Sequence, residues 1–228
     1  MNTAIIVAAG KGNRLGSETP KQFLEINGKP VIRYSMERFD EAPSVDDIVV
    51  VVSPENVDAF RSTARSFGIA KLRKIVAGGA SRAESVRNGL NAANAKTEIV
   101  AVHDAARPLV TVEEIERTIA AAGEYGAACL TAPVNDTIKV VADGVIRSTV
   151  DRSTLRKALT PQAFRYELLT KAFSASGTDA NITDECFLVE KLGHAIAAVE
   201  GNSRNIKITY PEDLEFARAV LAGDGRAK

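Results

Sequence analysis

The chain has 228 residues, of which 45% are hydrophobic and 25% are charged. This composition is typical of a globular protein with one well-buried core, and the length is too short for two full domains. Its 29 basic residues balance 29 acidic ones. The balance excludes an overall basic surface that would gather nucleic acid or anionic lipid, so any anion binding must be local.

Membrane and export signals are also missing from the sequence as read. No apolar run approaches the roughly 20 residues that cross a bilayer, and no secretory leader pattern is recognisable. We therefore expect a single cytoplasmic domain over residues 1–228, with neither a membrane nor a nucleic acid as its partner.

Short apolar runs alternate with helix-length segments along most of the chain. Several of these runs are apolar at consecutive positions, as expected for parallel strands that are covered on both faces. The runs are 3–9, 47–53, 72–77, 98–103 and 127–132. The alternation predicts an α/β fold with a Rossmann-like, doubly wound, mostly parallel sheet.

Local signals mark where several helices begin. Pro30 and Pro54 stand where a first helical residue is expected, since proline has no N–H to leave unbonded there. Three pairs have the spacing of a capping box, in which a hydroxyl and a carboxylate each bond a free backbone N–H. The pairs are Ser81 with Glu84, Thr111 with Glu114, and Thr209 with Glu212.

One segment, residues 136–150, interrupts the alternation of strands and helices. It has two β-prone runs joined by Asp143 and Gly144, which is a strong hairpin signal. Two strands alone are marginally stable in water, so we expect a projecting arm that packs against something, most simply a second copy of the chain. The alternative is an antiparallel edge added to the main sheet.

The loop after the first apolar run, "GKGNRLGSETPK", has glycines and cations but fits no familiar phosphate-binding template. In a dinucleotide-binding fingerprint that starts at Gly10 and Gly12, the third glycine would stand at position 15 and a helix would begin immediately. Here the third glycine is Gly16, and no helix signal follows it directly. A triphosphatase loop needs Gly-Lys before its hydroxyl residue, whereas Gly16 precedes Ser17 directly. What remains is a longer loop, which suits a nucleoside triphosphate or is simply a solvated basic loop. Its glycines and cations are Gly10, Gly12, Lys11, Arg14 and Lys21.

A second candidate, "VHDAARP" at 102–108, follows a predicted central strand. Open α/β sheets bind ligands at the carboxyl ends of such strands. Asp104 could coordinate Mg²⁺, and Arg107 could pair with a phosphate. The alternative is a capping aspartate with an internal salt bridge. We interpret His103 as a strand-end residue with a local hydrogen bond.

A third candidate, "GGASRAES" at 78–85, places glycines between a strand and a helix. Exposed backbone groups of such a loop can read the edge of a base, with Arg82 or Ser85 adding a side-chain contact. This signal is weak alone, because a helix start here would need Ser81 in any case.

Seven segments of the chain form a characteristic set. In chain order they are "AAGKGNRLG" with "PKQF", "GGASRAESV", "VHDAARP", "APVNDTIK", "TVDRSTLRKALTPQAF", "NITDE" and "NIKITYPEDL". Together they resemble the 2-C-methyl-D-erythritol 4-phosphate cytidylyltransferase family of the non-mevalonate isoprenoid pathway. The resemblance runs from about residue 3 to about residue 220 and departs at Val7, where the family often has proline.

The resemblance implies a nucleotidyltransferase fold and a Mg²⁺-dependent transfer from CTP. The acceptor would be 2-C-methyl-D-erythritol 4-phosphate, and the products 4-diphosphocytidyl-2-C-methyl-D-erythritol and pyrophosphate. The competing interpretations are a ribitol-5-phosphate cytidylyltransferase of the same fold and a non-catalytic nucleotide-binding domain. A pyrophosphate-release assay separates all three.

The resemblance also assigns roles to individual residues. Arg14 and Lys21 would stabilise the charge that develops in the reaction, Arg152 and Lys207 would position the sugar phosphate, and Asp104 would bind Mg²⁺. The implied nucleotide-binding residues are Ala8, Ala9, Gly10, Gly12, Gly79, Ala80, Ser85, Asp104 and Ala105. The implied substrate-binding residues are Arg107, Thr137, Arg152, Thr160, Thr183 and Lys207. The hairpin would be a homodimer arm that carries Thr137 and Arg152 to the neighbour's site.

Overall fold

The computed structural model describes residues 1–10, 20–176 and 182–224, and within them the core is a seven-stranded sheet in the order β11-β7-β10-β6-β1-β4-β5. All five predicted runs are strands of this sheet. Its strands are β1 (Asn2–Ala8), β4 (Asp47–Val52), β5 (Leu72–Ala77), β6 (Ile99–Asp104), β7 (Ala127–Pro133), β10 (Arg156–Arg165) and β11 (Ala197–Glu200). Among these described strands only β10 runs antiparallel to its neighbours, which are β6 and β7, so the predicted doubly wound, mostly parallel sheet is confirmed.

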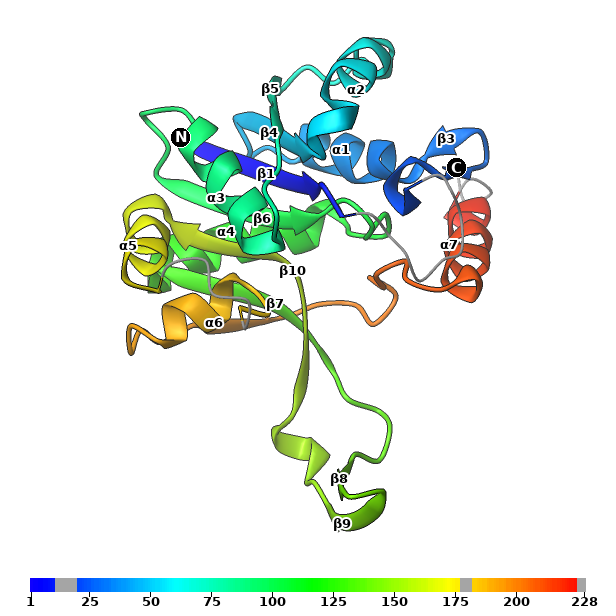
Figure 1. The fold of residues 1–228 in the computed structure, drawn as a ribbon, viewed down its shortest axis with the longest axis vertical. Helices are drawn as coiled ribbons and strands as arrows, with labels where there is room; N and C mark the ends of the chain where they lie inside the picture. Colours follow the sequence, from blue (N-terminus) through cyan, green and yellow to red (C-terminus); the bar gives the residue numbers. More distant parts are fainter. Residues whose placement is uncertain (11–19, 177–181, 225–228) are drawn as a thin grey trace.

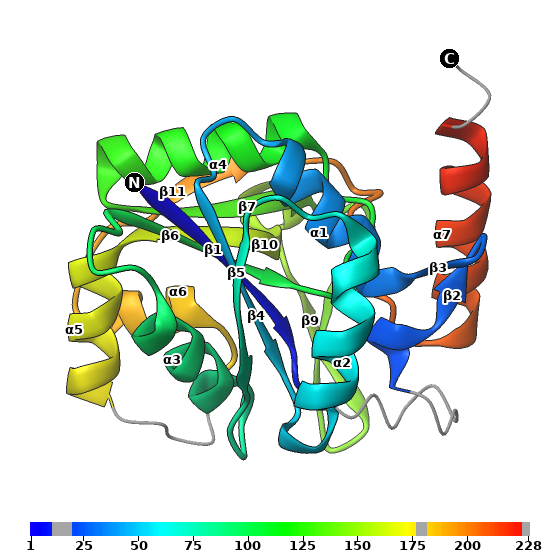
Figure 2. The same cartoon turned by 90° about the horizontal axis from the view of Figure 1, so that it is seen from above.

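Helices cover both faces of the sheet (Figures 1 and 2). These helices are α1 (Val31–Glu41), α2 (Val57–Ala64), α3 (Arg82–Ala92), α4 (Val112–Tyr125), α5 (Tyr166–Ser176) and α6 (Glu185–Glu190), whereas α7 (Pro211–Asp224) lies beside the sheet. Successive strand residues face opposite sides: Ile6 packs with α1, α2 and α4, while Ile5 packs with α3, α5 and α6. Both side chains are fully buried, which explains why the strand sequences are apolar without alternation. None of the described helices is long and apolar enough to span a membrane.

Two of the predicted helix starts use the expected hydroxyl. At α4 the full capping box forms: the Glu114 N–H donates to Thr111 Oγ1 at 3.2 Å, and the Thr111 N–H donates to Glu114 Oε2 at 3.0 Å. At α3 the Ser81 hydroxyl accepts from the Glu84 N–H at 3.1 Å, but the Glu84 carboxylate accepts from Ala80 instead of Ser81. The carboxylate there braces the preceding loop.

Of the remaining helix starts, the one at Pro54 agrees with the prediction, and those at Thr209 and Pro30 differ from it. Asp213, not Glu212, supplies the carboxylate at α7, where its Oδ2 accepts from the N–H groups of Thr209 and Tyr210, both at 2.8 Å. Pro54 begins a short 3-10 helix, η3 (Pro54–Asn56), ahead of α2. Pro30 lies one residue before α1, at the end of the two-residue strand β3 (Lys29–Pro30).

The predicted hairpin is a separate two-stranded sheet of β8 (Lys139–Ala142) and β9 (Val145–Thr149). Asp143 and Gly144 both have positive φ, 53° and 74°, as the tight turn requires. Figure 1 shows this arm projecting from the core, with the short 3-10 helix η5 (Arg152–Thr154) on its return path. The alternative of an added edge strand is therefore wrong.

A small cluster beside the main sheet fixes the carboxyl-terminal segment. The hairpin of β2 (Glu25–Ile26) and β3 packs against α7, and the buried side chains there include Ile26, Val31 and Ile208. Burial of Ile208 anchors the chain just before α7. Two more 3-10 helices, η2 (Lys21–Phe23) and η4 (Arg65–Phe67), complete the described elements.

Candidate active site

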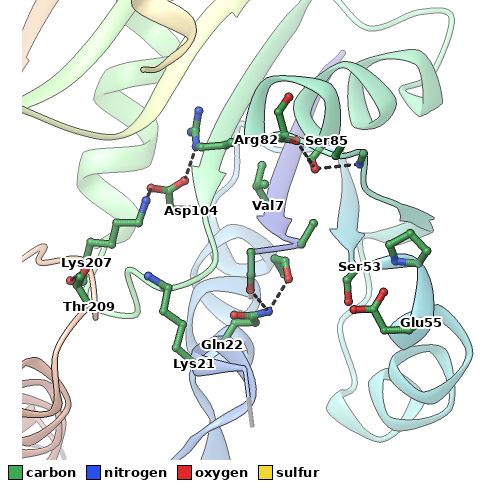
Figure 3. Close-up of a pocket in the computed structure, with 18 residues that line it drawn as sticks. Val7, Lys21, Gln22, Ser53, Glu55, Arg82, Ser85, Asp104, Lys207 and Thr209 are labelled. Carbon is green, nitrogen blue, oxygen red and sulfur yellow. Dashed lines mark hydrogen bonds and ion pairs between the residues drawn. The ribbon is translucent and has the colours of Figure 1, made fainter. Parts of the chain in front are cut away.

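A cavity of about 700 Å³ opens at the carboxyl ends of the parallel strands β1, β4, β5 and β6 (Figure 3). This is the edge at which open α/β sheets bind their ligands. It is lined by Val7, Ala8, Ala9, Gly10, Lys21, Gln22, Ser53, Pro54, Glu55, Gly79, Ala80, Ser81, Arg82, Ser85, Asp104, Ala106, Lys207 and Thr209. All three loops singled out in the sequence thus contribute to one cavity.

Asp104, the last residue of β6, lies among three cations. Its Oδ1 accepts from Arg82 Nε at 3.1 Å, its Oδ2 accepts from Lys207 Nζ at 2.7 Å, and Arg107 Nε lies 3.9 Å from Oδ2. Burial by itself would raise the pKa of Asp104, but the charges of Arg82 and Lys207 outweigh it and hold that pKa well below its ordinary value. The carboxylate is therefore ionised at any working pH.

Backbone contacts from neighbouring strands fix the position of Asp104. The next residue, Ala105, donates its N–H to the Val7 carbonyl at 3.0 Å, and the Asp104 N–H donates to Thr160 Oγ1 at 3.1 Å. Ala105 is fully buried, and its hydrogen bond joins the end of β6 to β1.

Lys207 reaches Asp104 because its segment is bonded to the loop after β6. Arg107 donates from Nη1 to the Asn205 carbonyl at 2.8 Å, and the Ile208 N–H donates to the Ala106 carbonyl at 2.9 Å. In this structure Arg107 therefore holds a chain segment, and it is not among the described residues that line the cavity.

His103 is fully buried and has no access to the cavity. Its Nε2 lies 3.2 Å from the Arg107 carbonyl, which can only accept, so Nε2 carries the proton. Its Nδ1, 2.9 Å from Thr160 Oγ1, then accepts from that hydroxyl. These local hydrogen bonds agree with the interpretation made from the sequence, and burial lowers the pKa of His103 to about 4 from its ordinary 6.5.

This pKa leads to a testable dependence of stability on pH. Between pH 7 and pH 4.5 His103 becomes protonated in the unfolded chain but stays mostly neutral in the folded chain. Acidification over this range therefore lowers the free energy of unfolding by about 2 kcal/mol through this residue. His103→Gln can keep both hydrogen bonds but cannot titrate. Chemical denaturation at pH 7 and at pH 4.5 measures how much free energy of unfolding each protein loses on acidification. This loss should be about 2 kcal/mol smaller in the variant than in the wild type. Equal losses in the two proteins would contradict it.

Lys21 and Gln22, in η2, join the cavity from a different direction (Figure 3). Lys21 donates from Nζ to the Ile208 carbonyl at 2.8 Å, which places its ammonium beside the Lys207 segment. Buried Gln22 donates from Nε2 to the carbonyls of Ala8 and Gly10, at 2.6 and 3.1 Å. This amide ties η2 to the end of β1, and no pattern in the sequence singles it out.

The loop between β5 and α3 is held by the Ser85 hydroxyl. Ser85 Oγ accepts from the Gly79 N–H at 3.1 Å and donates to the Ser81 carbonyl at 2.8 Å. A Cβ at Gly78 would lie 2.5 Å from the Cβ of Ala9, so only glycine lets this loop approach the end of β1. Ser85 thus shapes the loop that carries Gly79 and Ala80 to the cavity.

The other site candidates lie elsewhere. Thr160 is buried behind Asp104, and Thr183 is exposed outside the cavity. Thr137 and Arg152 are exposed on the arm, where Arg152 donates from Nη1 to the Asn135 carbonyl. Lys11, Gly12 and Arg14 fall outside the described residues. The roles implied for these residues stay predictions.

Among the described residues no three His, Cys, Asp or Glu side chains are grouped to hold an ion, so a metal ion at Asp104 would need further ligands from the substrate or from water. Mg²⁺ is often bound by one or two carboxylates together with substrate phosphates, so this donor set suits it. Each carboxylate oxygen of Asp104 also has a second lone pair beyond the one it uses for Arg82 or Lys207.

Comparisons with known proteins agree with one another. A family model described as 2-C-methyl-D-erythritol 4-phosphate cytidylyltransferase matches residues 2–223. A protein of that name from Syntrophotalea carbinolica is 45% identical over 97% of this chain and 96% of its own. The crystal structure of 4-diphosphocytidyl-2C-methyl-D-erythritol synthase from Anaerococcus prevotii has a TM-score of 0.84 at 28% identity and covers 97% of this chain and 98% of that one. The Francisella tularensis cytidylyltransferase has a TM-score of 0.80 at 31% identity, over 96% and 98% of the two chains.

Proposed function

The chain belongs to the 2-C-methyl-D-erythritol 4-phosphate cytidylyltransferase family, a family of nucleotidyltransferases, and from this membership we propose how its own residues perform the reaction. The enzyme joins CTP to 2-C-methyl-D-erythritol 4-phosphate and releases pyrophosphate. The observation that carries the assignment to this cavity is the buried Asp104 held between Arg82 and Lys207 at the carboxyl edge of the sheet. The catalytic unit is one nucleotidyltransferase domain over residues 1–228.

The reaction replaces one P–O bond at the α-phosphorus of CTP by another. An oxygen of the acceptor phosphate attacks the α-phosphorus of CTP in line and forms a new P–O bond, while the bond from that phosphorus to the bridging oxygen breaks and pyrophosphate leaves. A phosphate monoester has a second pKa near 6, so the nucleophile is already mostly deprotonated at neutral pH. Catalysis then depends on position and on positive charge, and no general base is required.

The cavity supplies that charge from several directions. Lys21 lines it beside the Ile208 carbonyl and would stabilise the oxygens that become more negative during transfer. Arg14 would act with it. Lys207 would position the acceptor phosphate, with Asp104 setting the orientation of its ammonium.

Asp104 would also hold the Mg²⁺ ion, together with phosphate oxygens of CTP. The ion supplies positive charge to the triphosphate when it is bound. The supporting observation is that Asp104 is a buried carboxylate kept ionised by its neighbours, which is the form a hard cation binds.

The arm supports a homodimer. Ile138, Val140, Val141, Val145 and Ile146 are 36–62% exposed on it, and a two-stranded sheet is marginal unless its apolar side chains are covered. A second copy of the chain would cover these side chains, and its own arm would carry Thr137 and Arg152 to the neighbouring cavity. We place the enzyme in the cytoplasm, where CTP is available, with neither a nucleic acid nor a membrane as its partner.

The test is a pyrophosphate-release assay that crosses CTP and UTP with the methylerythritol and ribitol phosphates. We expect release with CTP and 2-C-methyl-D-erythritol 4-phosphate, dependent on a divalent cation. Preferential release with ribitol 5-phosphate would move the enzyme to the sister activity, which the comparisons do not favour. No release with any pair would indicate a domain that only binds nucleotides.

A further inference from the structure

Glu185, the first residue of α6, is a fully buried carboxylate that does not line the cavity. Its Oε1 accepts from Arg82 Nη1 at 2.7 Å, and its Oε2 has no hydrogen-bond partner among the described residues. Burying a charge is costly unless it is well paired, and a neutral or apolar residue would avoid this cost. Glu185 therefore has a role that packing alone does not explain.

The start of α6 holds Glu185 firmly in place. The preceding Asp184 accepts from the Phe187 N–H at 3.0 Å and from Gln162 Nε2 at 2.9 Å. Gln162, on β10, also accepts from the Cys186 N–H at 3.2 Å. Glu185 thus acts on Arg82 from a fixed position that is bonded to the central sheet.

Arg82 is shared between two carboxylates. While its Nη1 donates to Glu185, its Nε donates to Asp104 Oδ1, so Asp104 receives a single hydrogen bond from this guanidinium. A guanidinium and a carboxylate left to themselves favour two parallel bonds. Such a two-bond pair would draw Asp104 Oδ2 away from Lys207, which now donates to it at 2.7 Å.

We propose that Glu185 is a positioning residue that acts through Arg82. By holding Nη1 it fixes the orientation of the guanidinium, so that Nε alone donates to Asp104 and the other Asp104 oxygen is left to Lys207. This inference rests on the proposed function, because it concerns the geometry of the same cavity.

Glu185→Gln tests the role of the charge. The amide keeps the size of the side chain and the acceptor oxygen but removes the negative charge. Because the contact with Glu185 is then weaker, the Arg82 guanidinium should turn and form two bonds with Asp104. We expect kcat for pyrophosphate release to fall about ten-fold, the scale of one hydrogen bond to a charged group. The KM for CTP should stay the same or fall, because the cavity becomes more positive toward an anionic ligand. A purely structural role would raise that KM and lower the melting temperature.

A double-mutant cycle shows whether the effect passes through Arg82. Lysine has a single ammonium group and lacks the planar set of N–H donors that lets arginine bond two carboxylates in a fixed geometry. In an Arg82→Lys background the Glu185→Gln change should therefore have little further effect on kcat. Independent, multiplying effects would overturn the proposal. Glu190→Gln is the matched control, since it removes a charge from an exposed position at the other end of α6 and should leave both constants unchanged.

Two further measurements separate the possible failures. Wild-type enzyme that releases no pyrophosphate would refute the proposed function itself, whereas an active wild type and an equally active Glu185→Gln variant would refute only the positioning role. If the glutamine variant does not fold, Glu185→Asp keeps the charge but shortens the side chain. It should lower kcat with an unchanged KM for CTP, and an unchanged kcat would overturn the proposal.

Discussion

Replacing Lys21 by alanine is expected to lower kcat for pyrophosphate release by about a hundred- to a thousand-fold, the scale measured when one transition-state donor is removed. The Lys21 ammonium lines the cavity, and its contact with the Ile208 carbonyl fixes it beside the segment that carries Lys207. Because the nucleophile needs no deprotonation, loss of this charge acts directly on the transferring phosphate. The KM for CTP should change far less than kcat.

Two control variants make this result specific. Lys171→Ala removes a lysine from the exposed surface of α5 and should leave kcat unchanged. Lys21→Arg keeps the charge with a different shape and should recover part of the lost rate. A Lys21→Ala enzyme with near-normal kcat would contradict the role of this lysine and leave the charge stabilisation to other residues, Arg14 first among them.

Two inactive variants are expected to restore activity when they are combined in one dimer. Arg152→Ala and Lys207→Ala should each be nearly inactive, because each removes a cation that positions the acceptor phosphate. If Arg152 serves the neighbour's cavity, a mixed dimer has one site with both residues intact. An equal mixture that is unfolded and refolded together should therefore recover about a quarter of wild-type activity, the statistical share for random pairing.

The same experiment has an internal control. Lys21 and Lys207 line one cavity within a single chain, so a mixture of Lys21→Ala and Lys207→Ala subunits has no intact site and should stay inactive. Recovery in both mixtures, or in neither, would contradict a site shared through the arm. Sedimentation of the wild-type protein should show a dimer. The double variant Val141→Lys, Ile146→Lys should sediment as a monomer.

Much of the fold was predictable because its signals are local. The runs at 3–9, 47–53 and 98–103 are apolar at consecutive positions because the strands are buried on both faces, and each became a strand of the parallel sheet. The tight turn at Asp143 and Gly144 needs positive φ at both residues, and these two residue types adopt it readily, so the signal is local. The Thr111 capping box likewise depends only on residues within one helical turn.

The strand β10 was not predicted, because its stabilising contacts are distant in the sequence. Its neighbours are β6 and β7, and no local pattern at 156–165 announces an antiparallel strand inserted between parallel ones. Its side chains nevertheless form the back of the site, with Thr160 bonded to His103 and Gln162 bonded to Asp184. Strand propensity depends on the neighbours that pairing supplies, and only the folded chain provides them.

The family, the α/β architecture, and the candidate loops around Gly10, Gly79 and Asp104 could all be predicted from the sequence. They follow from the residue types of short motifs and from the order of those motifs along the chain. Two contacts of the site depend on the folded chain: Arg82 joins Asp104 to Glu185, and Arg107 donates to the Asn205 carbonyl. Arg82 and Glu185 are 103 residues apart in the chain. Their pairing is set by how α3 and α6 pack on one face of the sheet, so the charge geometry of the site is a property of that packing.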